Sequence, residues 1–157
     1  MELKTLYREI LNEHNLNPSH KKPMENPSLS LRGVNPSCGD DITLNLKIQD
    51  GSVIDGSYTG SGCAVSQASV DMMLDLVIGK SKEEALQLAD IFIRMIQGKA
   101  SEAEIEELDE ASSLQDISHM PARVKCAVLG WHTMEEMLAE NKEGSISAEA
   151  GNPHCCN

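Results

Sequence analysis

Four potential metal ligands, Cys38, Asp40, Cys63 and Cys126, place the strongest constraint on how this chain can fold. They lie on three distant segments and include no Cys-x-x-Cys pair, so a shared site requires the fold to bring these segments together. Three thiolates and one carboxylate form a plausible tetrahedral set for Zn²⁺, in which the oxygen ligand exchanges most easily. Scattered core cysteines are the alternative, because free cysteine is commonly buried. For all three cysteines together, we favour one metal site.

The first two ligands lie at the mouth of an expected strand. Cys38 and Asp40 follow the turn-forming stretch 35–37 and lead into the run 41–48, in which polar and apolar residues alternate. Such alternation predicts a half-buried β-strand.

The other two ligands belong to expected helices. Cys63 follows the loop 59–62, whose glycines permit positive φ and close backbone approach, and a helical pattern begins at Ala64. Free amides and the macrodipole at a helix N-terminus favour the thiolate form of cysteine. Cys126 lies one to two turns into a helix that Pro121 starts, since proline is favoured at the first helical position. On this helix Arg123 or Lys125 could partly offset the negative charge of the site.

Apolar periodicity predicts an α+β domain, with a small three-stranded antiparallel sheet and helices packed on one side. The Asp50-Gly51 pair predicts a type I′ hairpin between two of the strands. The expected strands lie at about 29–34, 42–49 and 52–58, and the expected helices at the N-terminus to about Asn15, at 64–78, from Ser81 to Gly98, from Ser101, and at 121–140. In the last helix Trp131 is expected in the core, and the small Gly130 is expected to permit close approach.

Length, charge and composition limit the classes of function. A chain of 157 residues suits one domain, at 1–140, and the polar segment 141–157 is expected to be a disordered tail whose Cys155 and Cys156 bind metal at most adventitiously. A net charge of -12 without a basic stripe argues against nucleic acid. No signal peptide and no apolar run of ~20 residues is present, so we expect a cytoplasmic protein that binds no membrane. In that reducing compartment its five cysteines serve metal or redox chemistry rather than disulfides.

Two histidines near the N-terminus, His14 and His20, have the residue type of metal ligands. They lie around a loop rich in proline and polar residues, and we expect them to be exposed and without partners.

Three motifs resemble those of a known family. They are Asn-Pro-Ser-Cys-Gly-Asp at 35–40, Gly-Ser-Gly-Cys-Ala at 60–64, and Arg-Val-Lys-Cys-Ala-Val-Leu-Gly-Trp at 123–131. In this order they resemble the IscU/NifU-type iron-sulfur cluster assembly proteins, and the resemblance runs from the N-terminal helix to Leu138. It implies a fold of the SufE/NifU kind.

Two departures indicate the SufU branch of that family. Lys125 precedes Cys126 where scaffold-type members carry a histidine, and 119–123 reads His-Met-Pro-Ala-Arg in place of the Leu-Pro-Pro-Val-Lys chaperone-recognition motif. An extra stretch at about 99–120 is similar to the SufU insertion. The resemblance therefore implies a zinc-containing sulfur acceptor rather than a stable cluster scaffold.

The resemblance also implies residue roles and partners. Cys38, Asp40, Cys63 and Cys126 would bind metal or cluster, and Cys38 would accept sulfur from a pyridoxal-phosphate-dependent cysteine desulfurase of the SufS type. The protein would be a sulfurtransferase that acts with this desulfurase, and with assembly partners or recipient apoproteins, rather than a stand-alone enzyme. The alternative is a scaffold that binds iron or forms a transient [2Fe-2S] cluster on the same residues. A zinc hydrolase or deaminase is disfavoured, because the His-x-Glu and Pro-Cys-x-x-Cys signatures are missing.

Overall fold

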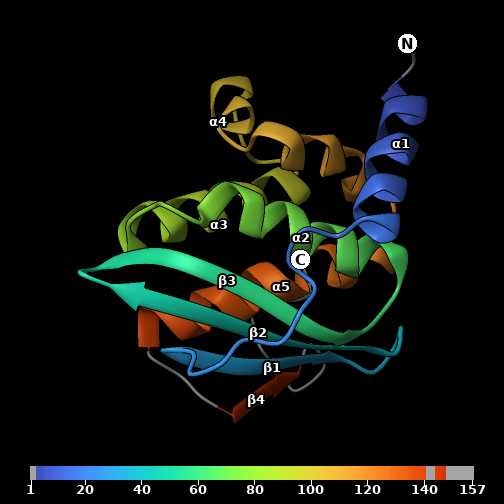
Figure 1. The fold of residues 1–157 in the computed structure, drawn as a ribbon. Helices are drawn as coiled ribbons and strands as arrows, with labels where there is room; N and C mark the ends of the chain where they lie inside the picture. The colour runs from blue at the N-terminus through green and yellow to red at the C-terminus, as the bar shows by residue number, and fades with distance from the viewer. Residues whose placement is uncertain (1–2, 141–143, 148–157) are drawn as a thin grey trace.

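One β-sheet forms the base of the structure, and helices cover one of its faces (Figure 1). The computed structural model describes residues 3–140 and 144–147. The strands are β1 (Leu29–Asn35), β2 (Asp40–Gln49), β3 (Ser52–Ser61) and β4 (Gly144–Ser147), in the order β3-β2-β1-β4. β1, β2 and β3 pair antiparallel, whereas β4 pairs parallel to β1. The three-stranded antiparallel sheet predicted from the sequence is therefore confirmed, and β4 extends it.

The fourth strand differs from the expectation for the tail. Residues 144–147 were expected to be disordered with the rest of 141–157, but they pair with residues 31–34 of β1. The open edge of β1 supplies unpaired backbone groups, and pairing with them can order a short polar segment. Residues 141–143 and 148–157, including Cys155 and Cys156, lie outside the described residues.

The β2–β3 hairpin forms as its turn residues predict. Asp50 and Gly51 both have positive φ, at 52° and 78°, as a type I′ turn requires. β3 continues past the predicted end at Tyr58, because residues 59–61 pair with 41–43 of β2. The glycine-containing loop before Cys63 is thus the end of a strand.

The described residues form six helical segments, five of which the sequence predicts. They are α1 (Leu3–Leu16), α2 (Ala64–Val77), α3 (Lys82–Ile96), α4 (Glu102–Glu106), the 3-10 helix η1 (Asp109–His119) and α5 (Pro121–Glu140). α3 and α4 both begin at the predicted serine with a capping box, in which the serine hydroxyl and a glutamate three residues later satisfy each other's backbone amides. The insertion at 99–120 folds as α4 and η1, and η1 contacts α1, α2, α3 and α5.

The core lies between the sheet and the helices, and α5 passes through its centre. Trp131 is completely buried, as expected, and stacks on Phe92 of α3 with ring centroids 4.2 Å apart. Its indole Nε1 donates a hydrogen bond of 2.9 Å to Ser69 Oγ of α2, so the polar edge of the ring is satisfied inside the core. No helix in the part of the chain that the structure describes is long and apolar enough to cross a membrane.

Close contact between α2 and α5 depends on Gly130. A Cβ atom at this position would lie 2.1 Å from Val70 Cγ2, so the absence of a side chain at Gly130 leaves the space that the Val70 methyl group occupies. Val70 is completely buried, and a β-branched side chain in a helix has essentially one rotamer. The two helices therefore cannot keep this spacing with a larger residue at 130.

Gly130→Ala should destabilise the fold by about 1–3 kcal/mol through overpacking, even though alanine is the better helix former by about 1 kcal/mol. Urea unfolding of the two proteins measures the effect. In a Val70→Ala background the same substitution should cost little, because the clashing methyl group is gone. The exposed substitution Gln87→Ala on α3 is the control. Equal costs in both backgrounds would contradict the role given to Val70.

Candidate metal centre

The turn between β1 and β2 carries two of the four predicted ligands. Asn35 and Asp40 face each other as the last pair of the β1–β2 ladder, and residues 36–39 form the turn between them. The Cys38 amide donates to Asn35 O at 3.2 Å, and Gly39 has the positive φ of 72° that closes the turn. Cys38 is half-buried, whereas Asp40 is completely buried.

Cys63 occupies the N-cap of α2. Its Sγ accepts a hydrogen bond from the Ser66 amide at 3.4 Å, so the thiol takes the capping role more often given to serine or aspartate. The preceding residue must be small, because a Cβ on Gly62 would lie 2.5 Å from Ser66 Oγ and 2.7 Å from Asp40 Oδ1. This is the close backbone approach expected of the glycine-containing loop.

The third segment brings in Cys126, which lies in the second turn of α5 and is completely buried. The ligand atoms of Cys38, Asp40 and Cys126 all lie within 4.8 Å of one another. Cys63 is not part of this tightest group, but its backbone amide donates a hydrogen bond to Asp40 Oδ1 at 2.8 Å. The structure therefore brings together all four residues that the sequence singled out.

Two further residues, Asn35 and Ser66, hold the Asp40 carboxylate. Asp40 Oδ1 accepts hydrogen bonds from the Cys63 amide at 2.8 Å and from Ser66 Oγ at 3.0 Å. Asp40 Oδ2 accepts one from Asn35 Nδ2 at 3.1 Å, and the same amide lies 3.7 Å from Cys126 Sγ. Both side chains are buried, and Asn35 Oδ1 has no hydrogen-bond partner among the described residues. They orient the carboxylate without themselves belonging to the ligand set.

Sequence reasoning missed both of these residues. The sequence predicts Asn35 only within a turn and a motif, and Ser66 only within a helix. Neither residue type is distinctive by itself, but Ser66 lies three residues after the N-cap, from where a side chain returns toward that cap.

The pKa values of the Cys63 and Cys126 thiols are shifted in opposite directions. The hydrogen bond from Cys126, with the Ser66 contacts, lowers the pKa of Cys63 below that of an ordinary thiol despite its burial. The same hydrogen bond, together with burial, raises the pKa of Cys126. Cys63 is therefore the more acidic of the two thiols, and Cys126 holds its proton more tightly. A divalent metal would displace the remaining thiol proton.

Arg123 supplies positive charge beside the sulfur atoms. The negative charges of Cys63 and Cys126 raise the pKa of this exposed guanidinium. Of the two cations considered from the sequence, Arg123 thus has a defined place at the site. Its charge partly offsets that of the thiolates.

The donor set fits zinc. Soft sulfur predominates, one carboxylate oxygen is present, and a buried amide donor lies within reach of both kinds of ligand atom. Zinc ligands are commonly oriented by such hydrogen bonds from outside the ligand set. The same four residues could also hold iron or a small iron-sulfur cluster.

The two histidines lie away from this centre, and the expectation that they are exposed and unpartnered is wrong. His14 is 7% exposed and hydrogen-bonds to Asp71 and Glu110. His20 Nε2 lies 2.7 Å from Asp75 Oδ1. The sequence gave no sign of these contacts, because all three acidic partners lie at least 50 residues further along the chain.

Known proteins share both the sequence and the fold. The chain is 40% identical over 137 residues to the iron-sulfur cluster assembly scaffold protein IscU of Streptococcus pyogenes serotype M1, which covers 87% of this chain and 85% of the relative. It is 39% identical to the zinc-dependent sulfurtransferase SufU of Bacillus subtilis, over 91% of this chain and 96% of the relative. A crystal structure of FiSufU from Fervidobacterium islandicum AW-1 matches with a TM-score of 0.79 at 33% identity, and covers 85% of this chain and 97% of that one.

The family model of the NifU-like N terminal domain matches residues 6–148, which include the three motifs and the insertion. The resemblance found in the sequence is therefore confirmed: this chain belongs to the family of the NifU-like N-terminal domain, with relatives of both the IscU and the SufU kind.

Proposed function

We propose that this chain acts in iron-sulfur cluster assembly as a zinc-containing sulfur acceptor, which takes persulfide sulfur from a pyridoxal-phosphate-dependent cysteine desulfurase of the SufS type. One observation carries the proposal: of the four clustered ligands only Cys38 and Cys63 are half-buried rather than buried, and of these two Cys38 lies on a turn instead of capping a helix. Asp40 and Cys126 are completely buried, and Cys63 is fixed as the cap of α2. Relatives named for both cluster assembly and zinc-dependent sulfur transfer support it.

The chemistry requires one thiolate that a partner's persulfide can reach. The Cys38 thiolate attacks the terminal sulfur of the desulfurase persulfide, a new S–S bond forms at Cys38, and the desulfurase cysteine leaves as a thiolate. No oxidant or reductant is consumed, since one S–S bond replaces another. The protein is thus a carrier that works with a desulfurase, and its free thiols suit a reducing compartment such as the cytoplasm.

The remaining residues keep the site ready for this exchange. Cys38, Asp40, Cys63 and Cys126 would hold zinc, which when bound would keep the thiolates deprotonated and shielded from oxidation. Asn35 and Ser66 fix the carboxylate, and Arg123 lowers the cost of gathering negative charge.

A second candidate function uses the same residues. The relatives named as IscU scaffold proteins favour a site on which a [2Fe-2S] cluster forms before its transfer to apoproteins. Anaerobic reconstitution with iron, sulfide and the desulfurase separates the two. A zinc-loaded protein that resists exchange for iron supports the sulfur acceptor, and stoichiometric cluster formation supports the scaffold.

The purified protein should contain about one tightly bound zinc per chain, because three thiolates and one carboxylate close a tetrahedral shell. Elemental analysis and competition with a chromophoric chelator measure this. Cys63→Ser and Cys126→Ser should each weaken zinc binding by at least about tenfold. The paired control, Cys155→Ser with Cys156→Ser, lies outside the matched family region and should keep full zinc content. Metal-free protein from a zinc-replete preparation would refute the site.

Cys38→Ser should abolish stimulation of the cognate desulfurase, because serine cannot accept sulfur. Alkylation trapping with mass spectrometry should find the persulfide on Cys38 in the unaltered protein and nowhere in the variant. The double serine variant of the tail cysteines should accept sulfur normally. If a persulfide persists in Cys38→Ser, or appears on the tail pair, the assignment is wrong and Cys126 becomes the next candidate.

Asp40→Ala should make any reconstituted iron-sulfur cluster several-fold longer-lived, since the exchangeable oxygen ligand is the expected exit route. The cluster lifetime is measured from the decay of its absorbance under anaerobic conditions. Asp41→Ala is a matched control, because Asp41 pairs with Arg32 on the exposed side of the sheet. Equal lifetimes in the two variants would exclude the role given to Asp40.

A further inference from the structure

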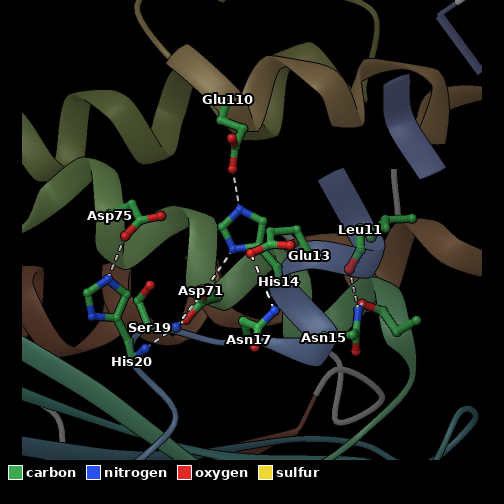
Figure 2. A network of polar contacts seen from close by, with 11 residues as sticks. Leu11, Glu13, His14, Asn15, Asn17, Ser19, His20, Asp71, Asp75 and Glu110 are labelled. Atoms are coloured by element: carbon green, nitrogen blue, oxygen red, sulfur yellow. Dashed lines mark hydrogen bonds and ion pairs between the residues drawn. The ribbon is translucent and has the colours of Figure 1, made fainter. Parts of the chain in front are cut away.

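A second polar cluster, remote from the cysteines, joins three separate parts of the chain around His14 of α1 (Figure 2). His14 Nδ1 lies 2.6 Å from Asp71 Oδ2 of α2, a residue 57 positions away. On the opposite side of the ring, Nε2 hydrogen-bonds to Glu110 of η1, 96 positions away. The imidazole therefore lies between a carboxylate from the core helix and one from the insertion.

Asp71 is the buried end of this cluster. It is completely buried, yet accepts hydrogen bonds from the backbone amides of Ser19 at 3.3 Å and His20 at 2.9 Å, in addition to His14. His20 then pairs with Asp75, one helical turn along α2. The loop that follows α1 is thus attached to the same face of α2 as α1 itself.

The two carboxylates favour a charged imidazole. A neutral histidine carries one N–H donor and one acceptor, so it can donate to only one of Asp71 and Glu110, whereas the imidazolium donates to both. Burial alone would lower the pKa of His14, but the hydrogen bonds and charges of Glu110 and Asp71 outweigh it and raise the pKa above the ordinary value. The charged groups at the ring are Asp71 and Asp75 from α2 and Glu110 from η1. The nearest other titratable groups in the cluster are His20 of the loop, which pairs with Asp75, and Glu13, the neighbour of His14 on α1.

A metal ion is the competing occupant. The ligand atoms of His14, Asp71 and Asp75 lie within 4.8 Å of one another, which is close enough for a shared cation. Both ring nitrogens, however, already face a carboxylate oxygen at hydrogen-bond distance, so no nitrogen lone pair is directed at an open position. The contacts favour a protonated ring over a metal ligand.

We propose that His14 is a pH-dependent clasp that fastens the N-terminal helix and the insertion to α2. The clasp is complete while the ring is charged, so its stabilisation is fully present below the unfolded pKa of histidine and is lost as pH rises through the higher folded value. Loss of the proton leaves two carboxylates for one donor, and α1 with the insertion should then separate from α2 more often.

One contact links the clasp to the start of α2, where the metal centre lies. Next to His14, Asn15 Nδ2 donates to Ala64 O at 3.0 Å, and Ala64 is the residue after the Cys63 cap. An opened clasp would therefore loosen the chain beside the first turn of α2. The inference rests on these contacts alone and does not require the proposed sulfur transfer.

Nuclear magnetic resonance of the full-length, zinc-loaded protein tests the proposal. The His14 ring should titrate with a midpoint above that of an ordinary histidine. Above this midpoint, hydrogen-exchange protection factors of α1 amides should fall about tenfold or more, while those of α5 stay constant. A His14 midpoint at or below the ordinary value, or α1 protection that does not change across the titration, would overturn the clasp.

Three variants distinguish loss of the His14 contacts from a general loss of stability. His14→Gln should lower α1 protection at pH 6 and make it independent of pH up to pH 9. Glu110→Gln, at a more exposed position, should lower the His14 midpoint while the fold is kept. His119→Gln changes an exposed histidine at the end of η1 and should leave α1 unaltered. A zinc titration in which the unaltered protein binds one ion more than His14→Gln would overturn the clasp in favour of a second metal site.

Discussion

The buried carboxylate of Asp40 is the interaction on which the candidate metal centre depends. An ionised carboxylate inside a protein is costly unless donors surround it, and here the Cys63 amide, Ser66 and Asn35 supply them. These donors come from the end of β1 and the start of α2. Pairing this one carboxylate therefore holds the ends of β1 and β2 against α2. Cys38, two residues before Asp40, is thereby held beside the sulfur atoms of α2 and α5. The site is a consequence of how that carboxylate is paired.

α2 links this centre to the rest of the molecule. Its first turn is capped by Cys63, its middle packs on α5 through Val70 and Gly130, and its outer face receives α1 through Asp71. Ser69 donates to Ala127 O at 2.6 Å and accepts from Trp131, so the two helices also share a polar contact inside an apolar core. A displacement of α2 would therefore move a metal ligand, a core contact and the N-terminal helix together.

The sequence predicted the parts of the fold that local chemistry determines. Asp50-Gly51 specified the hairpin, the capping boxes at Ser81 and Ser101 specified two helix starts, and alternation located the three antiparallel strands. The convergence of the ligands was foreseeable because three cysteines and an aspartate each lie at a turn, a strand mouth or the start of a helix. One shared metal site explains these positions together better than separate core positions do. What could not be foreseen depends on partners remote in sequence: β4 needs the free edge of β1, and His14 needs Asp71 and Glu110. Asn35 and Ser66 were missed since an amide and a hydroxyl carry no distinctive sequence signal.

The unequal exposure of the four ligands bears on which chemistry the centre can perform. A scaffold that keeps a cluster benefits from ligands that are all held equally, whereas a sulfur acceptor needs one thiolate that a partner can reach. Here the turn presents Cys38, while Asp40 and Cys126 are enclosed and Cys63 is bound into a helix cap. Arg123, exposed beside the sulfurs, adds a positive charge that would attract an approaching persulfide anion to a chain of net charge -12. This asymmetry supports the proposal of transfer through Cys38 over retention of a cluster.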